Sequence, residues 1–355
     1  GGAQNYIYCH DGGEVILYHN GSQKIATTST GVDVTGFIDY GPSSGNIGKI
    51  GSDSNNIYIG ATSNAGEIIF RNNVGSTDAP HSSGTNKFVI GDNDIRTPTS
   101  GTSNVRLGVN AGNSIASGGD YNVCVGDEAG TAISTGHLHT FIGYGAGDAV
   151  TTNETGLTAV GANALTSNTS GTDNLAIGVS ALEDCTEGIG NIAVGRYAAA
   201  DIIDADGNVA IGAFDGTVQP AMRYNTKSHD NVAVGAGALS THNLTDNSSG
   251  YNTAVGYAAG NDVTTGIKNT LLGARSGDAL IDADSNVAIG ESALSSDTYG
   301  DGSVAIGDSA LYAQNFTSAA TSFNTAVGYA AGNSTTTGQS NVFVGHSSGQ
   351  FNSTG

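Results

Sequence analysis

A five-residue unit decides the fold: Asn174-Leu175-Ala176-Ile177-Gly178, which returns as Asn191-Ile192-Ala193-Val194-Gly195 and Asn208-Val209-Ala210-Ile211-Gly212. Its closing glycine recurs at positions 91, 108, 126, 143, 161, 178, 195, 212, 235, 256, 273, 290, 307, 328 and 345. The steps are mostly 17 residues, with two of 18, two of 21 and one of 23, and a separate copy lies at 56–60. A regular period of this length indicates stacked turns of a solenoid.

Each position of the unit has a physical interpretation. Side chains alternate across a strand, so the aliphatic residues one and three places before the glycine share a face, which we expect to be the dry interior. Val255 and Ile289 are examples. The Ala between them predicts that the opposite face packs closely as well. The glycine predicts a corner with positive φ, and the Ala three residues later, as in Ala181, predicts a second packed layer.

The asparagine predicts a ladder. Asn begins the unit in twelve of sixteen copies, and turns stacked about 4.8 Å apart would bring these amides into register. Seventeen residues have a contour of about 56 Å, which suits two short strands and two turns. We therefore predict an all-β chain, with a repetitive parallel β-helix or β-roll of roughly 17-residue turns over residues 86–355.

The first 85 residues lack the period. Short apolar stretches at 15–18 and 68–70 are separated by turn residues such as Asn20-Gly21, which favours short strands in an irregular β shaft or small β-domain over 1–85. The chain begins at Gly1 without a Met or a signal peptide, so we expect a fragment or a processed product.

Composition excludes several classes of function. The 355 residues include 55 Gly and no Trp, only 12% are charged, and the net charge is −21. Such an acidic chain does not favour nucleic acid or an anionic membrane surface. No apolar run approaches the roughly 20 residues needed to span a bilayer, so we expect no membrane insertion. Cys9, Cys124 and Cys185 are far apart, which predicts packing residues rather than a disulfide framework or a zinc site.

Motifs that imitate catalytic sites are explained by the repeat. Gly345-His346-Ser347-Ser348-Gly349 matches a nucleophile elbow, but the same five positions are Gly256-Tyr257-Ala258-Ala259-Gly260 in another turn. The glycines at 143–147 have no phosphate-loop Lys after them. A glycan-cleaving enzyme needs a pair of carboxylates in a groove, whereas the Asp and Glu of this chain are scattered at turns. We therefore predict a protein that is not an enzyme, with no catalytic residue and no cofactor.

Metal binding is a weak alternative. Asp204-Ala205-Asp206 and Asp282-Ala283-Asp284 resemble pieces of calcium loops but lack the distal Glu, so we interpret them as solvated turns where carboxylates crowding in an oligomer could hold a cation. His137-Leu138-His139 has the spacing of a metal-binding pair, but we interpret it as a polar turn. Threonine runs such as 335–337 are too mixed with other residues to predict a flat ice-binding array.

A family resemblance enters with Asn252 to Gly260 followed by Thr264-Thr265-Gly266, and with the near copy at 324–332 followed by 336–338. These residues resemble repeats of bacteriophage tail fibres of the type with a cleaved C-terminal chaperone. The unit is similar to head repeats of trimeric autotransporter adhesins, although those repeats are shorter. The resemblance implies a left-handed homotrimer and a structural role.

Two functional hypotheses follow from this resemblance. The first is a structural fibre protein of a phage tail, located in the virion and in contact with other tail proteins and a host cell-surface receptor or glycan. The alternative is a bacterial surface adhesin or an extracellular filament subunit. A full gene encoding a chaperone or a membrane anchor would separate them.

Receptor contact is predicted on the longest insertion, between Gly212 and Asn231. Cationic and aromatic side chains are scarce in the rest of the chain, and insertions in solenoids leave on one face that is often the binding face. The residues predicted to contact a receptor are Met222, Arg223, Tyr224, Lys227 and His229.

Overall fold

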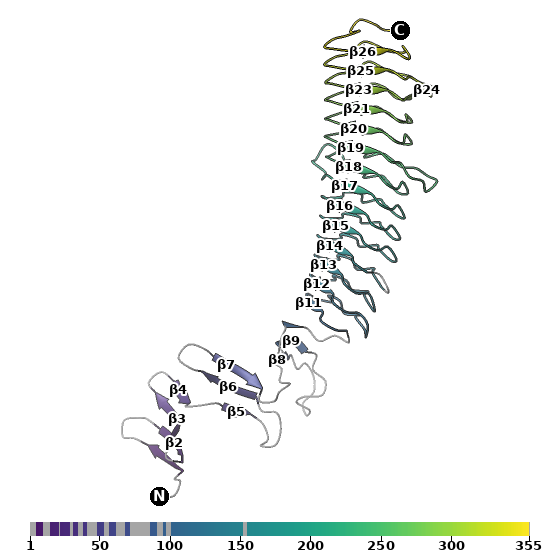
Figure 1. Cartoon of the computed structure of the whole chain (residues 1–355). Coiled ribbons are helices and arrows are strands. Elements are labelled where there is room, and N and C mark those ends of the chain that lie inside the picture. The colour runs from purple at the N-terminus through teal and green to yellow at the C-terminus, as the bar shows by residue number, and fades with distance from the viewer. Residues whose placement is uncertain are drawn as a thin grey trace. The chain divides into compact units, whose positions relative to one another are not determined.

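A computed structural model of the chain describes residues 101–151 and 155–354, and in the first hundred residues the segments 5–9, 15–20, 22–28, 31–34, 38–40, 48–52, 57–61, 68–71, 86–90 and 95–96. The described backbone is all β and contains no helix. The chain divides into two compact units, Gly1–Pro98 and Thr99–Gly355 (Figure 1). The predicted fold class is confirmed in the second unit.

The first unit consists of antiparallel strands in three small sheets, ordered β1-β2-β3-β4, β5-β6-β7 and β10-β9-β8. The strands are β1 (Tyr6–Cys9), β2 (Val15–His19), β3 (Ser22–Thr28), β4 (Gly31–Val34), β5 (Ile38–Tyr40), β6 (Gly48–Ser52), β7 (Ile57–Ala61), β8 (Ile68–Arg71), β9 (Asn86–Ile90) and β10 (Ile95–Arg96). Segment 86–98 therefore belongs to this unit, although the sequence pattern assigned it to the repetitive part.

The second unit is a β-solenoid whose strands form one parallel sheet of fourteen, in strict register (Figure 1). They are β11 (Val105–Leu107), β12 (Val123–Val125), β13 (Thr140–Ile142), β14 (Thr158–Val160), β15 (Leu175–Ile177), β16 (Ile192–Val194), β17 (Val209–Ile211), β18 (Val232–Val234), β19 (Thr253–Val255), β20 (Thr270–Leu272), β21 (Val287–Ile289), β23 (Val304–Ile306), β25 (Thr325–Val327) and β26 (Val342–Val344). A minor pair, β22 (Gly300–Asp301) and β24 (Ala320–Thr321), widens one turn.

Each turn contains one three-residue strand of the main sheet instead of the expected two short strands. The rest of the turn consists of consecutive tight turns and bends. These bends are held from turn to turn by backbone hydrogen bonds, such as Leu165 N to Ala181 O at 3.0 Å and Leu182 N to Ala198 O at 3.2 Å. The bends close the lumen tightly, so the interior of each turn has little room.

The predicted interior face of the strand is wrong. The middle residue points inward: Ala176, Ala254 and Ala288 have no exposed surface. The flanking aliphatic residues, including Val255 and Ile289, point outward and are partly exposed. A narrow lumen explains the inversion, because a small side chain on the strand leaves space for large side chains on the opposite wall. The Ala three residues beyond the glycine, exemplified by Ala181, is fully buried, which confirms the second packed layer.

The lumen is filled by complementary volumes. Where the strand residue is Ala, as at Ala176, the residue four beyond the glycine is usually large, as at Leu182. Where that position is glycine, a large strand residue fills the space: a Cβ on Gly147 would lie 2.6 Å from the Phe141 ring, and one on Gly332 would lie 2.7 Å from Phe343. Large and small residues therefore alternate between the two walls, as close packing requires.

The corner glycine is required by the stacking. Gly178 has φ of +134°, and a Cβ there would lie 2.5 Å from the carbonyl oxygen of Gly195 in the next turn. The predicted positive φ at this corner is confirmed. Four residues later the backbone is left-handed even without glycine, with φ of 50° at Leu182, so burial of the leucine in the lumen offsets local strain.

The asparagines form the predicted ladder, inside the solenoid. Asn191 Oδ1 accepts the backbone N–H of Asn208 at 3.0 Å, and Asn174 Oδ1 accepts that of Asn191 at 2.8 Å. Most of these amides also close their own turn, as when Asn191 Nδ2 donates to Ala205 O at 2.7 Å. These groups are buried and satisfied, so the ladder contributes to stability and keeps the turns in register.

The cysteines divide between the two units. Cys124 and Cys185 are buried packing residues in the solenoid, as predicted, and burial raises the pKa of each thiol to about 12. Cys9 is exposed on β1, so the packing prediction is wrong at that position. All three are free thiols.

Candidate assembly surface and attachment loop

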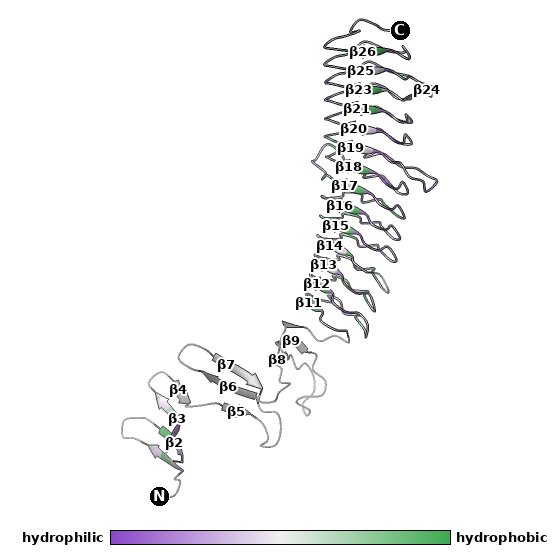
Figure 2. Cartoon of the chain, viewed as in Figure 1, coloured by the Kyte–Doolittle hydropathy of each residue, from purple (hydrophilic) through white to green (hydrophobic). Residues whose placement is uncertain are grey.

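The outer face of the fourteen-stranded sheet carries two columns of side chains, which we call the aliphatic stripe. One column lies directly before the glycine and runs from Leu107 to Val344, and every member is Ile, Val or Leu. The other lies three places before the glycine and contains Val, Leu, Ile and Thr. Figure 2 shows the hydrophobic colour recurring on these strands along the solenoid.

The stripe is exposed enough to contact another molecule. Ile177 and Ile211 retain 38% and 39% of their surface, and Leu272 retains 46%. Fourteen rows spaced about 4.8 Å apart make a surface about 65 Å long and about 10 Å wide, on the order of 600 Å². No member is charged. Soluble monomers seldom expose a continuous apolar patch of this size without using it for binding.

The residues predicted to contact a receptor lie in an ordinary turn, directly after the insertion. An ordinary turn has two residues between the closing glycine and the next buried Ala, whereas this turn has eight between Gly212 and Ala221. Six residues are therefore extra, and we call residues 213–220 the inserted loop. From Ala221 onward the chain resumes the usual pattern, with Met222 fully buried at the position that holds leucine in other turns. Met222 is therefore a packing residue and is unavailable to a receptor.

The cationic side chains of this turn are paired with the preceding turn. Arg223 forms an ion pair with Asp201, and Lys227 Nζ lies 3.7 Å from Asp204 Oδ2. His229 Nδ1 accepts the backbone N–H of Asp206 at 2.9 Å. The grouping of positive charge seen in the sequence is thus largely neutralised, and His229 serves the stacking of turns.

The inserted loop is fastened at both ends. Asp215 Oδ1 accepts the backbone N–H groups of Thr217 and Val218, each at 2.8 Å, which forms a tight turn at its tip. Phe214 N donates to Arg196 O at 3.3 Å, and Gly237 N donates to Gln219 O at 2.7 Å. The loop therefore contacts the turn before it and the turn after it.

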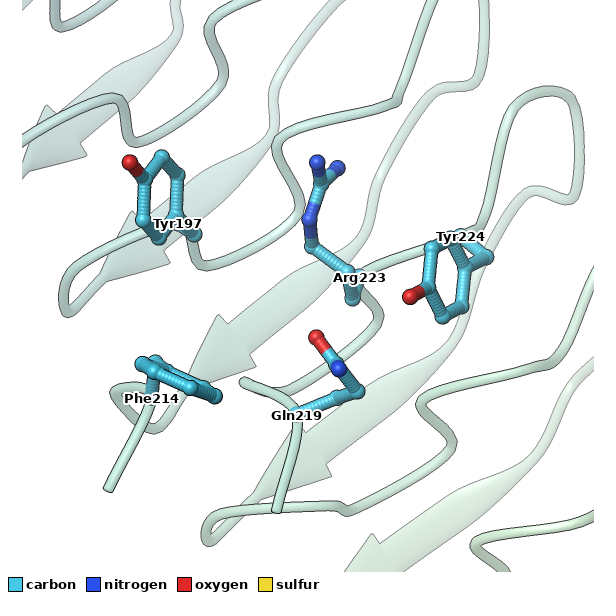
Figure 3. Close-up of a pocket in the computed structure, with 5 residues that line it drawn as sticks. All are labelled: Tyr197, Phe214, Gln219, Arg223 and Tyr224. Atoms are coloured by element: carbon cyan, nitrogen blue, oxygen red, sulfur yellow. The ribbon is translucent and has the colours of Figure 1, made fainter. Parts of the chain in front are cut away.

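A hollow of about 240 Å³ lies between this loop and the solenoid wall. Figure 3 shows its lining, which consists of Tyr197, Phe214, Gln219, Arg223 and Tyr224. The structure brings Arg223 and Tyr224 together with three residues that the sequence reasoning missed. Tyr197 is 26 residues before Arg223 and reaches the site only through stacking. Phe214 and Gln219 lie in the inserted loop, and the spacing of the glycines alone does not place that loop at 213–220.

Two of the aspartates that resembled calcium loops accept hydrogen bonds from the backbone. Asp206 Oδ1 accepts the N–H of Ile189 at 2.7 Å, and Asp284 Oδ1 accepts that of Ile267 at 2.8 Å, each from the preceding turn. Asp301 Oδ1 likewise accepts the N–H of Asp284. Across the described residues, no group of three His, Cys, Asp or Glu side chains is arranged to hold a metal ion.

The two histidines of the 137–139 segment point to different environments. His139 is fully buried at the usual Asn position and stacks on Phe141 with ring centroids 5.1 Å apart. His137 is partly exposed and pairs with Thr155 of the next turn through a parallel β-bridge. A shared metal would need both rings to converge, so this arrangement supports a structural role.

The apparent nucleophile elbow at 345–349 is a solenoid corner. Ser347 N donates to Tyr329 O of the preceding turn at 2.8 Å, and a Cβ on Gly349 would meet the Phe343 ring at 2.2 Å. These contacts are those of the corresponding positions in other turns, so they support the interpretation of this segment as a repeat variant.

No protein family, curated protein or solved structure was found to match the chain. Over the part of the chain that the structure describes, none of the backbone forms a helix of the length and apolarity needed to cross a bilayer.

Proposed function

We propose that the chain is a structural subunit of a homotrimeric fibre of a phage tail, in which the aliphatic stripe is the contact between subunits. The repeat's resemblance to tail-fibre sequences supports the class, and the stripe supports self-association. The observation that carries the proposal is the outward direction of the aliphatic side chains on all fourteen strands of the sheet.

Burial of the stripe would be strongly favourable. Removing apolar surface from water contributes about 25 cal/mol per Å², and a stable interface needs on the order of 800 Å² from each partner. The stripe approaches that area and is continuous along the solenoid. A second copy fits it well because it carries the same 4.8 Å repeat and no charge. Other virion proteins and a host receptor then contact the surfaces that remain exposed.

Light scattering of the intact protein tests the assembly. We expect a mass of three chains, and we expect the Ile177→Lys, Ile211→Lys double variant to shift the protein toward monomer, since lysine cannot be buried unpaired in an apolar contact. The matched control is Ile189→Lys, Ile203→Lys, which changes isoleucines that are 48% and 41% exposed but lie off the stripe. A wild-type monomer at micromolar concentration, or equal dissociation in both variants, would contradict the proposal.

A further inference from the structure

We propose that the hollow under the inserted loop binds one neutral hexopyranose ring of a glycan. This inference rests on the attachment part of the proposed function and gives it a site and a ligand class. The site consists of Tyr197 from the turn after β16, Phe214 and Gln219 from the loop after β17, and Arg223 and Tyr224 from the turn that follows (Figure 3).

The chemistry of the lining points to a sugar. Three aromatic side chains border the hollow, and a pyranose presents C–H groups that pack against aromatic faces. Gln219 offers both a donor and an acceptor, and the guanidinium of Arg223 carries five N–H donors. Sugar hydroxyls both donate and accept, so this mixture of groups suits them. A small number of polar groups among aromatic ones is the usual composition of a small-ligand site.

The local charge favours a neutral sugar over an acidic one. Arg223 is already paired with Asp201, so its positive charge is compensated. The chain as a whole carries a charge of −21, which repels anionic polymers. A carboxylate on the ligand would find no uncompensated positive charge in the lining.

The volume of the hollow limits the bound part of the ligand to one sugar ring. The hollow has a volume of about 240 Å³, below the roughly 300 to 1,000 Å³ of pockets for drug-sized molecules. Its open side leaves room for the glycan to continue into solvent. Because the ligand is small and the site is shallow, we expect affinity in the millimolar range for one ring, about 4 kcal/mol in binding free energy.

The site is built in advance of the ligand. Tyr224 N donates to Ser240 O of the next turn at 3.0 Å, and Ala221 N donates to Gly212 O across the base of the inserted loop at 3.2 Å, so the backbone that carries Arg223 and Tyr224 is fixed on both sides. The guanidinium of Arg223 lies 5.8 Å from the Tyr197 ring centroid and 5.5 Å from that of Tyr224. These contacts hold the polar and aromatic groups in place, which lowers the entropy cost of binding.

Saturation-transfer NMR on the full chain tests the inference with methyl glycosides of glucose, galactose and mannose, and with glucuronic acid as the acidic probe. We expect at least one neutral glycoside to bind, with little change between low and high salt, and glucuronic acid to bind more weakly. No transfer from any neutral glycoside up to about 50 mM would overturn the inference. Tighter binding of glucuronic acid would overturn the choice of a neutral ligand.

Two variants locate the binding. Tyr224→Ala and Phe214→Ala should each weaken it about tenfold, because each removes an aromatic face. Tyr144→Ala is the matched control, since Tyr144 is 60% exposed on another turn and lies outside the hollow. Unchanged binding in both the Tyr224→Ala and Phe214→Ala variants, with unchanged circular dichroism, would overturn the assignment. Binding is measured per chain, so it is separable from the trimer: a monomer that binds the sugar refutes the fibre proposal alone.

Discussion

β7 and β15 carry similar local sequences and pair in opposite ways. Ile57-Tyr58-Ile59-Gly60 lies in an antiparallel sheet against β6, whereas Leu175-Ala176-Ile177-Gly178 lies between parallel copies of itself. The difference lies in what surrounds the unit. After Gly178 come a buried Ala181 and Leu182, which fill a lumen, whereas Asn64 stands at the leucine position after Gly60. A strand motif therefore becomes a solenoid turn only when the following residues can close it.

The largest effect is expected at the closing glycine. Gly178→Ala would place a Cβ 2.5 Å from the Gly195 carbonyl oxygen at a φ of +134°, so we expect the solenoid to lose about 3 kcal/mol or more. The equivalent Gly60→Ala lies within an antiparallel strand and should cost about 1 kcal/mol or less. Urea unfolding followed by circular dichroism measures both. Equal losses would mean that the two glycines have the same role.

The next change tests the inverted strand faces. Ala254→Asp puts a charge into a fully buried site of the lumen and should destabilise the solenoid by about 3 to 5 kcal/mol. Val255→Asp faces outward and should cost the folded chain much less, while weakening self-association. Comparing urea midpoints with light scattering separates the two results. A greater loss of stability for Val255→Asp than for Ala254→Asp would instead support the prediction from the sequence that Val255 faces the interior.

The third change tests the asparagine ladder that runs through the solenoid. Asn191→Ala removes the acceptor for Asn208 N and the donor to Ala205 O, so we expect a loss of about 1 to 3 kcal/mol, because both partners stay buried. Asn113→Ala is the control, since Asn113 is exposed. A cost at Asn191 no larger than that at Asn113 would mean that the ladder is replaceable by water.

A pH dependence is expected from one buried corner of the solenoid. Burial lowers the pKa of His242 to about 4, from 6.5. Its neutral ring lies 2.9 Å from Ser228 Oγ and 3.3 Å from Asn252 Nδ2. The unfolded chain takes up a proton near pH 6.5 and the folded chain does not. The contribution of neutral His242 to the free energy of unfolding is therefore fully present above pH 6.5. It decreases as the pH falls from 6.5 to 4, and it decreases no further below pH 4.

His242→Asn isolates this effect, because Asn occupies the same corner at Asn168. We expect the wild type to lose about 2 kcal/mol or more relative to the variant between pH 7 and pH 4. Burial raises the pKa of Asp278 to about 6, which acts in the opposite direction with pH and is common to both proteins. Parallel stability curves for wild type and variant would show that His242 does not titrate on unfolding.

The smallest expected effect is a difference in the rate of thiol modification between the two units, which the cysteines report. Cys9 is exposed, whereas Cys124 and Cys185 are buried with the pKa of each thiol raised to about 12. At neutral pH a thiol reagent should modify one cysteine per chain quickly and the other two only when the solenoid opens. Mass spectrometry of the labelled peptides gives the order. Simultaneous modification of all three would mean that the solenoid opens as readily as the first unit.

The period was readable because a solenoid repeats each contact in every turn. Spacing of the glycines predicted the parallel stack, and the Asn positions predicted the ladder. The face of the strand was misassigned because hydrophobicity places Val255 inside, whereas the width of the lumen, which depends on all seventeen residues of a turn, leaves room only for Ala254. The sequence also pointed to the proposed attachment region without its geometry, since Tyr197 and Tyr224 meet only after two turns have stacked.

The alternation of volumes between the two walls limits how such a chain can change by recombination. Gly147 depends on Phe141 of its own turn and Gly332 depends on Phe343 of the next, whereas Leu182 lies opposite an alanine strand. Deleting the turn that carries Phe343 would leave Gly332 facing a void, and inserting that turn next to a leucine-bearing one would crowd the lumen. Gene duplication and loss in this repeat should therefore preserve compatible neighbours, so the heritable unit is larger than one seventeen-residue turn.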